Sequence, residues 1–243
     1  MQPSAKKCCA FLRPSSVNNN TASSGLLQRA LARACDVQPQ ETRATLASFL
    51  LVFLLMGSYY IVRPVRDALA SNWTDAEVSW LWTFTFFIST IAVSVYGAAI
   101  SRIRFQRLVP SVYALFAASF VLFYFAAHDS TQSVLLDKAF YLWVSLFSLF
   151  HISVFWSFMA DTFSKPQATR LFGFIGAGAS AGGIAGPATA SLLVGDLGTE
   201  ALLLIASAML VMALPLVVWL QRLKFSDLHN QDVALDTANL AIG

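Results

Sequence analysis

Six segments of the chain are apolar along their whole length and contain no Asp, Glu, Lys or Arg. Each is about 18 to 25 residues long, and they are 45–62, 78–101, 108–127, 139–160, 171–195 and 201–220. Roughly 20 apolar helical residues cross a hydrocarbon layer of about 30 Å. A helix of a water-soluble core seldom stays uncharged for so long, because one of its faces meets water. The pattern therefore predicts an all-α, polytopic membrane protein with six transmembrane helices in a lipid bilayer.

Polar sequence at both ends divides the chain into three parts. We predict a polar cytoplasmic leader (1–44), a six-helix transmembrane domain (45–222) and a cytoplasmic tail (223–243). Charged residues make up only 12% of the chain, against roughly 25% in soluble domains, so no soluble domain of useful size remains. The three cysteines, Cys8, Cys9 and Cys35, all lie in the leader and have no metal-ligand spacing. The leader also lacks the apolar core of a secretory signal.

The positive charges predict the orientation. All 16 Lys and Arg residues fall outside the six segments, and 13 of them lie in the leader, in the connections 102–107 and 165–170, and after the last segment at Arg222 and Lys224. The other three connections hold only Arg63, Arg66 and Lys138. Cytoplasmic loops are the ones enriched in Lys and Arg. Both termini are therefore expected to face the cytoplasm, as an even number of spans requires.

The fifth segment is rich in small residues. Gly178, Gly182 and Gly186 recur every four residues and so form one stripe along a helix. Such a stripe lets another membrane helix approach closely, and Pro187 removes one backbone hydrogen bond and bends the helix. Two interpretations stay open: plain helix packing, and a closely packed helix that rocks between two states.

Two arginines stand at the end of the first segment. Arg63 and Arg66 are three residues apart and share a helical face if the helix continues past Pro64. They could then offer bidentate hydrogen bonds to an anionic solute. The alternative is that they reach outward to lipid headgroups, as arginines near a helix end often do.

Two further polar residues lie in or beside the fourth segment. Asp161 ends it, and we expect this carboxylate to pair with Arg170 or Arg102 as a latch between helices; a solvated surface pair is the alternative. His151 lies alone among apolar residues. Hydrogen bonding to a neighbouring backbone or hydroxyl group is favoured for it over proton relay.

Signatures of catalysis are missing from the sequence. It contains no phosphate-binding loop, no H-E-x-x-H, no G-x-S-x-G and no Cys/His metal spacing. We therefore predict no catalytic residues, no enzyme activity, no cofactor, no metal site and no nucleic-acid partner. Short connections and six spans favour transport or assembly.

Two stretches carry a family resemblance. The first reads SYYIVRPVRDAL over 58–69, and the second reads VFWSFMADTF over 154–163 and continues through 167–178 to Gly186 and Pro187. Together they resemble bacterial major-facilitator-type transporters related to the ATP:ADP (NTP/NDP) exchange translocases. The run 182–187 resembles the fifth-helix antiporter motif of the wider superfamily. The resemblance extends over about 45–222.

The resemblance implies about twelve helices in two six-helix halves, with the solute held between the halves and each half built from inverted three-helix repeats. This chain matches the first half. It is therefore expected to be a truncated product, or to pair with a second six-helix half or another copy, in a bacterial inner membrane. Its loop 101–107 departs from the superfamily pattern, because it contains neither Asp nor Gly.

Our first hypothesis is a secondary transporter, or the N-terminal half of one, that moves an anionic solute such as a nucleotide by alternating access. The alternative is a non-transporting membrane scaffold or regulator. The expected solute ligands are Tyr59, Tyr60, Arg63 and Arg66. The expected gating residues are Gly178, Gly182, Gly186, Pro187, Asp161, Arg170 and Arg102.

Overall fold

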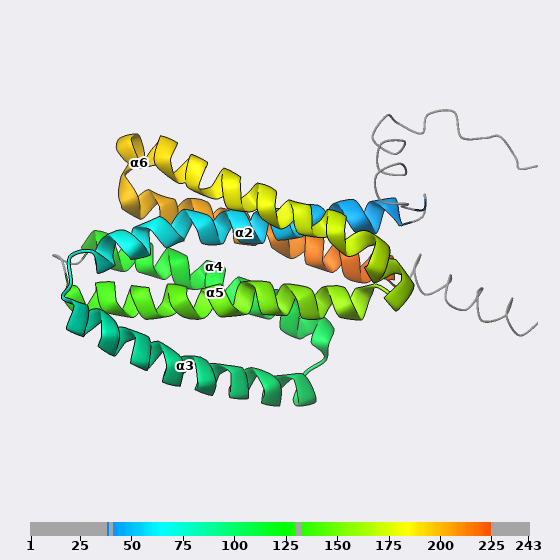
Figure 1. Ribbon diagram of the computed structural model, residues 1–243, viewed down its shortest axis with the longest axis horizontal. Coiled ribbons are helices and arrows are strands. Elements are labelled where there is room, and N and C mark those ends of the chain that lie inside the picture. The colour runs from blue at the N-terminus through cyan, green and yellow to red at the C-terminus, as the bar shows by residue number, and fades with distance from the viewer. Residues whose placement is uncertain (1–37, 39–40, 130–132, 225–243) are drawn as a thin grey trace, which may run out of the picture.

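The computed structural model describes residues 38, 41–129 and 133–224, and within them the regular structure is helical. The helices run along the long axis of the molecule (Figure 1). Their bounds are α2 (Thr42–Ala70), α3 (Asp75–Arg102), α4 (Phe105–Asp129), α5 (Val134–Thr162) and α6 (Lys165–Leu223). All five are long and apolar enough to cross a membrane. The cysteines at 8, 9 and 35, with nearly all of the leader and tail, lie outside the described residues.

Helix α6 is folded back on itself. It has 59 residues, which as a straight helix would extend about 88 Å. Gly198 interrupts it with φ 79° and ψ 167°, a conformation that glycine adopts without the steric cost of a Cβ. Figure 1 shows the two arms, yellow and orange, running in opposite directions along the bundle from the turn where they meet. The predicted segments 171–195 and 201–220 therefore both fall in α6, one on each arm.

Two helices begin with reciprocal caps that follow from the sequence. The backbone N–H of Thr74 donates to Glu77 Oε2 at 3.1 Å before α3, and that of Ser164 donates to Gln167 Oε1 at 3.0 Å before α6. Caps of this kind satisfy backbone donors that a helix start leaves unpaired. They explain why α3 and α6 begin directly after such short connections.

The core lies where α2 packs against α5 and α6. Its largest fully buried side chains include Leu51, Leu55, Phe120, Phe147 and Phe155. Helix α3 lies apart along one side of the bundle (Figure 1), and Leu81 is its single buried residue. Large apolar side chains on α3 remain open to the surroundings, as suits a lipid-facing helix.

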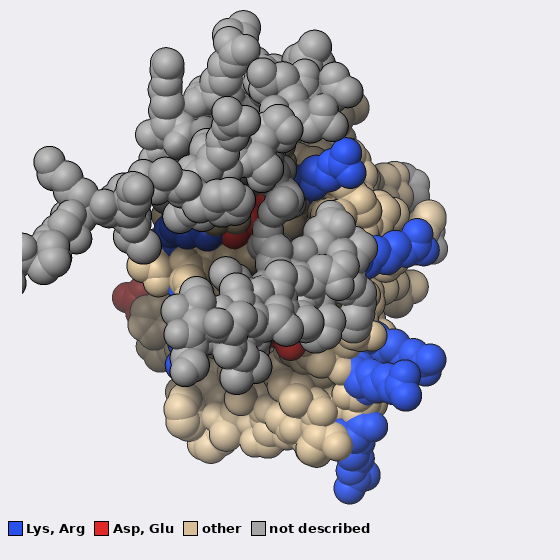
Figure 2. All heavy atoms as spheres, turned by 90° about the vertical axis from the view of Figure 1, so that its right-hand side faces the viewer, with Lys and Arg blue, Asp and Glu red and all other residues tan. Residues whose placement is uncertain are grey.

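One end of the bundle is basic. The start of α2, the α3–α4 and α5–α6 connections and the end of α6 meet there (Figure 1). Figure 2 views this end and shows Lys and Arg side chains along its rim. The exposed cations of these segments are Arg43, Arg102, Arg104, Arg107, Lys165 and Arg222.

Candidate functional site

Helix α2 carries the predicted solute ligands, and it remains helical through Pro64 to its last residue. Pro64 has no N–H, so the carbonyl of Tyr60 loses its donor in the helix ladder. The helical spacing nevertheless continues, and it keeps Arg63, Arg66 and Asp67 within about one turn of each other. The continuous helix that the arginine hypothesis required is therefore present.

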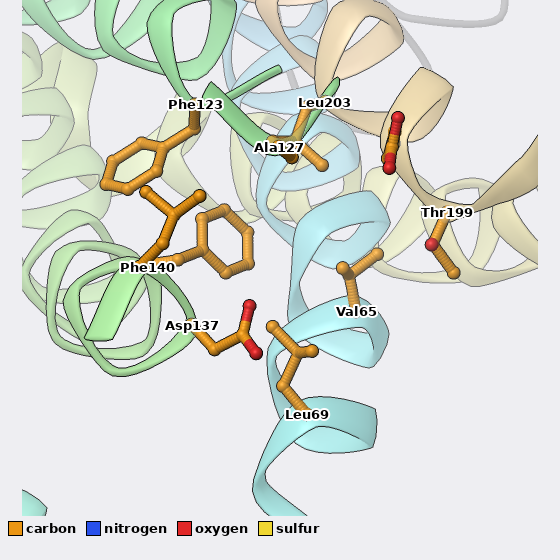
Figure 3. Close-up of a pocket in the computed structure, with 10 residues that line it drawn as sticks. Val65, Leu69, Phe123, Ala127, Asp137, Phe140, Thr199 and Leu203 are labelled. Atoms are coloured by element: carbon orange, nitrogen blue, oxygen red, sulfur yellow. The ribbon is translucent and has the colours of Figure 1, made fainter. Parts of the chain in front are cut away.

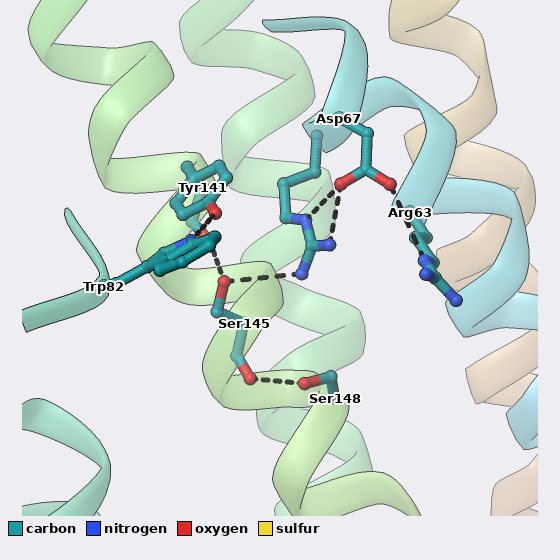
Figure 4. A network of polar contacts seen from close by, with 7 residues as sticks. Arg63, Asp67, Trp82, Tyr141, Ser145 and Ser148 are labelled. Atoms are coloured by element: carbon teal, nitrogen blue, oxygen red, sulfur yellow. Dashed lines mark hydrogen bonds and ion pairs between the residues drawn. The ribbon is translucent and has the colours of Figure 1, made fainter. Parts of the chain in front are cut away.

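Arg66 is held between α2 and α5. Its Nε and Nη2 donate to Asp67 Oδ1 at 2.9 and 2.7 Å, and its Nη1 donates to Ser145 Oγ at 3.5 Å. Its Cζ lies 5.3 Å from the ring centroid of Tyr141. The side chain is only 15% exposed. Figure 4 shows these contacts converging on one guanidinium, so Arg66 has little freedom to turn.

Arg63 is placed differently. Its Nε lies 3.6 Å from Asp67 Oδ2, and the side chain is 45% exposed. Its Cζ lies 5.6 Å from the ring centroid of Tyr60 on the preceding turn. Arg63 contacts Oδ2 of Asp67 and Arg66 contacts Oδ1, so the two arginines bind different oxygens of one carboxylate. The two cations therefore flank one carboxylate instead of projecting in one direction.

The two predicted tyrosines also diverge. The Tyr59 ring stacks on His151 of α5 with 4.8 Å between centroids, which turns it into the bundle. His151 is 2% exposed, and its Nδ1 lies 2.9 Å from the carbonyl oxygen of Phe147. This backbone contact is the role that the sequence favoured for His151 over proton relay.

Tyr60 lines a hollow between α2 and the first arm of α6. The hollow has a volume of about 350 Å³ and is bounded by Met56, Tyr60, Ala179, Ser180 and Gly183. A Cβ on Gly183 would meet the Tyr60 ring at 3.4 Å, so the ring packs closely on the α6 backbone at this glycine. Arg63 lies over the same ring, so Tyr60 stands between the cation and the hollow.

The glycine stripe of α6 faces α2. A Cβ on Gly178 would lie 2.6 Å from the carbonyl oxygen of Phe49, and one on Gly186 would lie 2.8 Å from that of Gly57. A Cβ on Gly182 would meet the carbonyl oxygen of Phe53 even more closely. Real Cβ atoms do not reach such distances, so the backbones approach through the stripe. The packing interpretation of the stripe is therefore present in the structure.

Pro187 lies inside the first arm of α6, which remains helical around it. Because proline has no N–H, the carbonyl of Gly183 loses its donor in the helix ladder. This weakened turn borders the hollow that Gly183 lines. Movement of α6 at Pro187 stays a prediction.

The ion pairs at the basic end differ from the expected ones. Asp161 Oδ2 accepts a hydrogen bond from Lys224 Nζ at 2.8 Å, and not from Arg170 or Arg102. Arg170 Nη2 donates to Glu41 Oε1 at 3.0 Å. In the state described the expected pairs are not formed, because the fold brings the end of α6 and the start of α2 closer to these side chains. A gating role for these residues stays a prediction.

A second, smaller cavity opens at the other end of the bundle. It has a volume of about 140 Å³, and apolar side chains with two carboxylates, Asp137 and Glu200, form its wall. Figure 3 shows the Asp137 carboxylate directed toward this space. None of the predicted solute ligands lines it.

Sequence reasoning missed the partners that complete the site. They are Ser145 and Tyr141 beside Arg66, and Glu41 and Lys224 at the basic end. Ser145 and Tyr141 are four residues apart on α5, so a polar stripe was available as a signal. No pattern in the sequence marked Glu41 as a partner, because it lies in the polar leader.

Within the part of the chain that the structure describes, no group of three or more His, Cys, Asp or Glu residues could hold a metal ion. The cations above suit an anion instead. Guanidinium groups recognise carboxylate, sulfonate and phosphate oxygens through charge-assisted hydrogen bonds.

Comparison with known proteins gives one match. The family model described as Major Facilitator Superfamily matches residues 48–236, which is more than three quarters of the chain. No curated protein and no solved structure gives a match. The matched range includes the arginines of α2, the hollow and the whole of α6.

Proposed function

Since the chain belongs to the major facilitator superfamily of membrane transporters, we propose that it is a secondary transporter that moves an anionic solute by alternating access. The observation that carries this proposal is the half-exposed Arg63 beside the hollow at Tyr60. Asp67 balances only one of the two guanidinium groups, and an excess positive charge on a membrane helix is a candidate site for a solute. Family membership favours transport over the scaffold alternative.

We propose that the chain crosses the membrane six times and forms one half of a major-facilitator bundle. The reversal at Gly198 supports two crossings by α6, and the basic end supports a cytoplasmic position for both termini. A second six-helix half, or a second copy, would close the solute path on its open side. A bacterial inner membrane is the location that the family resemblance implies.

We also propose how the bundle changes state. The glycine stripe gives α6 a smooth surface on which to slide against α2, and Pro187 weakens the turn beside the hollow. The pairs Arg170–Glu41 and Asp161–Lys224 hold the basic end together in the state described. Arg102, exposed at the end of α3, would meet them only after a rearrangement.

The proposal also concerns which anion the protein carries. Resemblance to the nucleotide exchangers makes ADP and ATP candidates. The exposed guanidinium and the adjoining aromatic ring of Tyr60 also suit other organic anions.

An exchange assay tests the proposal. Liposomes containing the purified full chain are loaded with labelled ADP or labelled naphthalene-2-carboxylate, and the unlabelled compound is added outside. We expect at least one label to leave faster than from protein-free liposomes. The double variant Arg63→Gln/Arg66→Gln should reduce that release to the protein-free rate, because no cation remains at the site.

Arg43→Gln serves as the matched control. Arg43 is also exposed on α2 but belongs to the basic end, so this variant should exchange at the wild-type rate. Exchange that survives in the double variant would show that the arginines anchor the helix and do not bind solute. If the chain exchanges neither compound and binds neither of them, the proposal itself is contradicted.

A further inference from the structure

The two arginines of α2 differ in partners and exposure, and the difference narrows the substrate class. We infer that Arg66 is a positioning residue, that Arg63 alone binds the solute, and that the solute is an organic molecule with a single negative charge whose body occupies the hollow at Tyr60. This inference rests on the proposed transport function and adds the chemical class of the substrate.

The contacts of Arg66 engage three of its five N–H donors and occupy the side of the guanidinium that Nε and Nη2 form. Nε and Nη2 both serve Asp67, at 2.9 and 2.7 Å, and Nη1 serves Ser145. The face of the guanidinium is covered by Tyr141, 5.3 Å away. A side chain that is 15% exposed and engaged on three sides fixes α2 against α5.

Arg63 has the opposite character. Its single ion contact, to Asp67, is long at 3.6 Å, and 45% of its side chain is exposed. A charge pair so open to its surroundings contributes at most about 1 kcal/mol. An incoming anion can therefore replace the Asp67 carboxylate on Arg63 while the tight bond from Arg66 to Asp67 stays intact.

The charges of the site limit the charge of the solute. Asp67 balances one of the two guanidinium groups, so the cluster carries one net positive charge. The next cation along α5, Lys138, is already paired with Glu77 at 2.8 Å and adds nothing. One carboxylate, sulfonate or phosphodiester neutralises the cluster, whereas a nucleoside triphosphate would leave several charges uncompensated at a costly position.

The hollow supplies the place for an uncharged body. Its volume of about 350 Å³ lies within the range of small-molecule sites, roughly 300 to 1,000 Å³. The Tyr60 ring forms one wall and carries Arg63 at 5.6 Å. A Cβ on Gly183 would touch the ring at 3.4 Å, so the first arm of α6 packs against Tyr60 on that side. An aromatic or aliphatic group in the hollow can contact the Tyr60 side chain while its acidic group reaches Arg63.

The test measures binding to the full chain in nanodiscs of neutral phosphatidylcholine. The probes are naphthalene-2-carboxylate, naphthalene-2,6-dicarboxylate, the neutral naphthalene-2-carboxamide and ATP. We expect the monocarboxylate to bind at least about tenfold more tightly than the other three, because only it balances one positive charge through a charge-assisted contact. Tighter binding of ATP or the dicarboxylate would overturn the inference.

Two double variants with the same net charge separate the roles of the arginines. Arg66→Gln/Asp67→Asn and Arg63→Gln/Asp67→Asn each leave one guanidinium. The first should keep the wild-type affinity for the monocarboxylate within about threefold, and the second should lose about tenfold or more. Equal affinities in the two would overturn the assignment of Arg63.

Single variants keep the test decisive if a double variant fails to fold. Asp67→Asn leaves two net positive charges, so its preference should shift by about tenfold toward the dicarboxylate. Gly183→Leu should fill part of the hollow and weaken binding of the monocarboxylate. Because an added Cβ meets the Tyr60 ring at 3.4 Å, the melting temperature is measured beside the affinity to show that the variant is folded. An unchanged preference in Asp67→Asn would contradict the charge argument.

A lipid headgroup shares the chemistry of the proposed solute. Replacing part of the phosphatidylcholine by phosphatidylglycerol, which carries one negative charge, distinguishes the two sources. If phosphatidylglycerol displaces the monocarboxylate completely, Arg63 is a lipid anchor and the inference fails. If no probe binds to any form of the chain, the proposed function fails with it.

Discussion

At the scale of single residues, the two ion pairs at the basic end differ in the burial of their carboxylates. Glu41 is 1% exposed where it accepts from Arg170, whereas Asp161 is 47% exposed where it accepts from Lys224. A buried carboxylate that loses its cation keeps its desolvation cost. An exposed one regains water, so its pair contributes little. The two pairs look alike in geometry, yet they should differ in their contribution to stability.

The Arg170→Gln variant tests this difference, because it takes this cation away from the buried Glu41 carboxylate. We expect it to lower the free energy of unfolding by about 2 kcal/mol or more. Lys224→Gln is the matched control, which leaves the exposed Asp161, and should cost under about 1 kcal/mol. Thermal unfolding in detergent micelles measures both, and equal losses would show that burial does not separate the pairs.

Residue-level pairing was the part least accessible from the sequence. Asp161 was expected to pair with Arg170 or Arg102, which are near it in the chain or in a neighbouring loop. Its partner, Lys224, is 63 positions away, and Glu41 is 129 positions from Arg170. Charge counting finds which residues need partners, but only the packing of α6 against α2 decides which partners they receive.

Among the elements, α2 and the first arm of α6 make the closest approach. The positions of the apolar segments and the spacing of the glycines were sufficient to predict both helices and the stripe. The sequence could not show which helix the stripe faces, because any neighbour satisfies a surface without side chains. The structure places Phe49, Phe53 and Gly57 against it.

Gly182→Ala tests the closeness of this contact. The new methyl group would meet the Phe53 carbonyl oxygen and the Gly57 nitrogen, and backbone atoms cannot turn away as a side chain can. We expect a loss of about 1 to 3 kcal/mol in the free energy of unfolding, measured by thermal unfolding.

Gly173→Ala is the control on the same arm. A Cβ there has nothing within 4 Å, so the higher helix propensity of alanine should raise stability by up to about 1 kcal/mol. If Gly182→Ala were as harmless as Gly173→Ala, the stripe would not be a contact surface.

For the whole molecule, we predict the direction of each crossing from the reversal at Gly198 and from the basic end. The end that holds the α3–α4 connection also holds the end of α6 (Figure 1). The opposite end holds the α2–α3 connection and Gly198. Positive charges favour the cytoplasmic side for the first of these ends.

Cysteine labelling tests the crossing pattern. In a variant whose three native cysteines are serine, single cysteines replace Arg104, Arg222, Asn72 or Thr199, all of which are exposed. A membrane-impermeant maleimide added to intact cells should label positions 72 and 199 only. Disrupted cells should show labelling at all four. Labelling of position 222 from outside would mean that the second arm of α6 does not cross.

The contact between the glycine stripe and α2 also bears on how the protein is made. Gly178 meets Phe49 across 129 positions of sequence, so α2 enters the bilayer long before its partner is synthesised. In that interval acyl chains cover the face of α2 that later meets the glycine stripe. When the first arm of α6 arrives, it must expel them, and the release of lipid contributes to helix association. Completion of the bundle should therefore respond to the surrounding acyl-chain composition, even where the amino-acid contacts are unchanged.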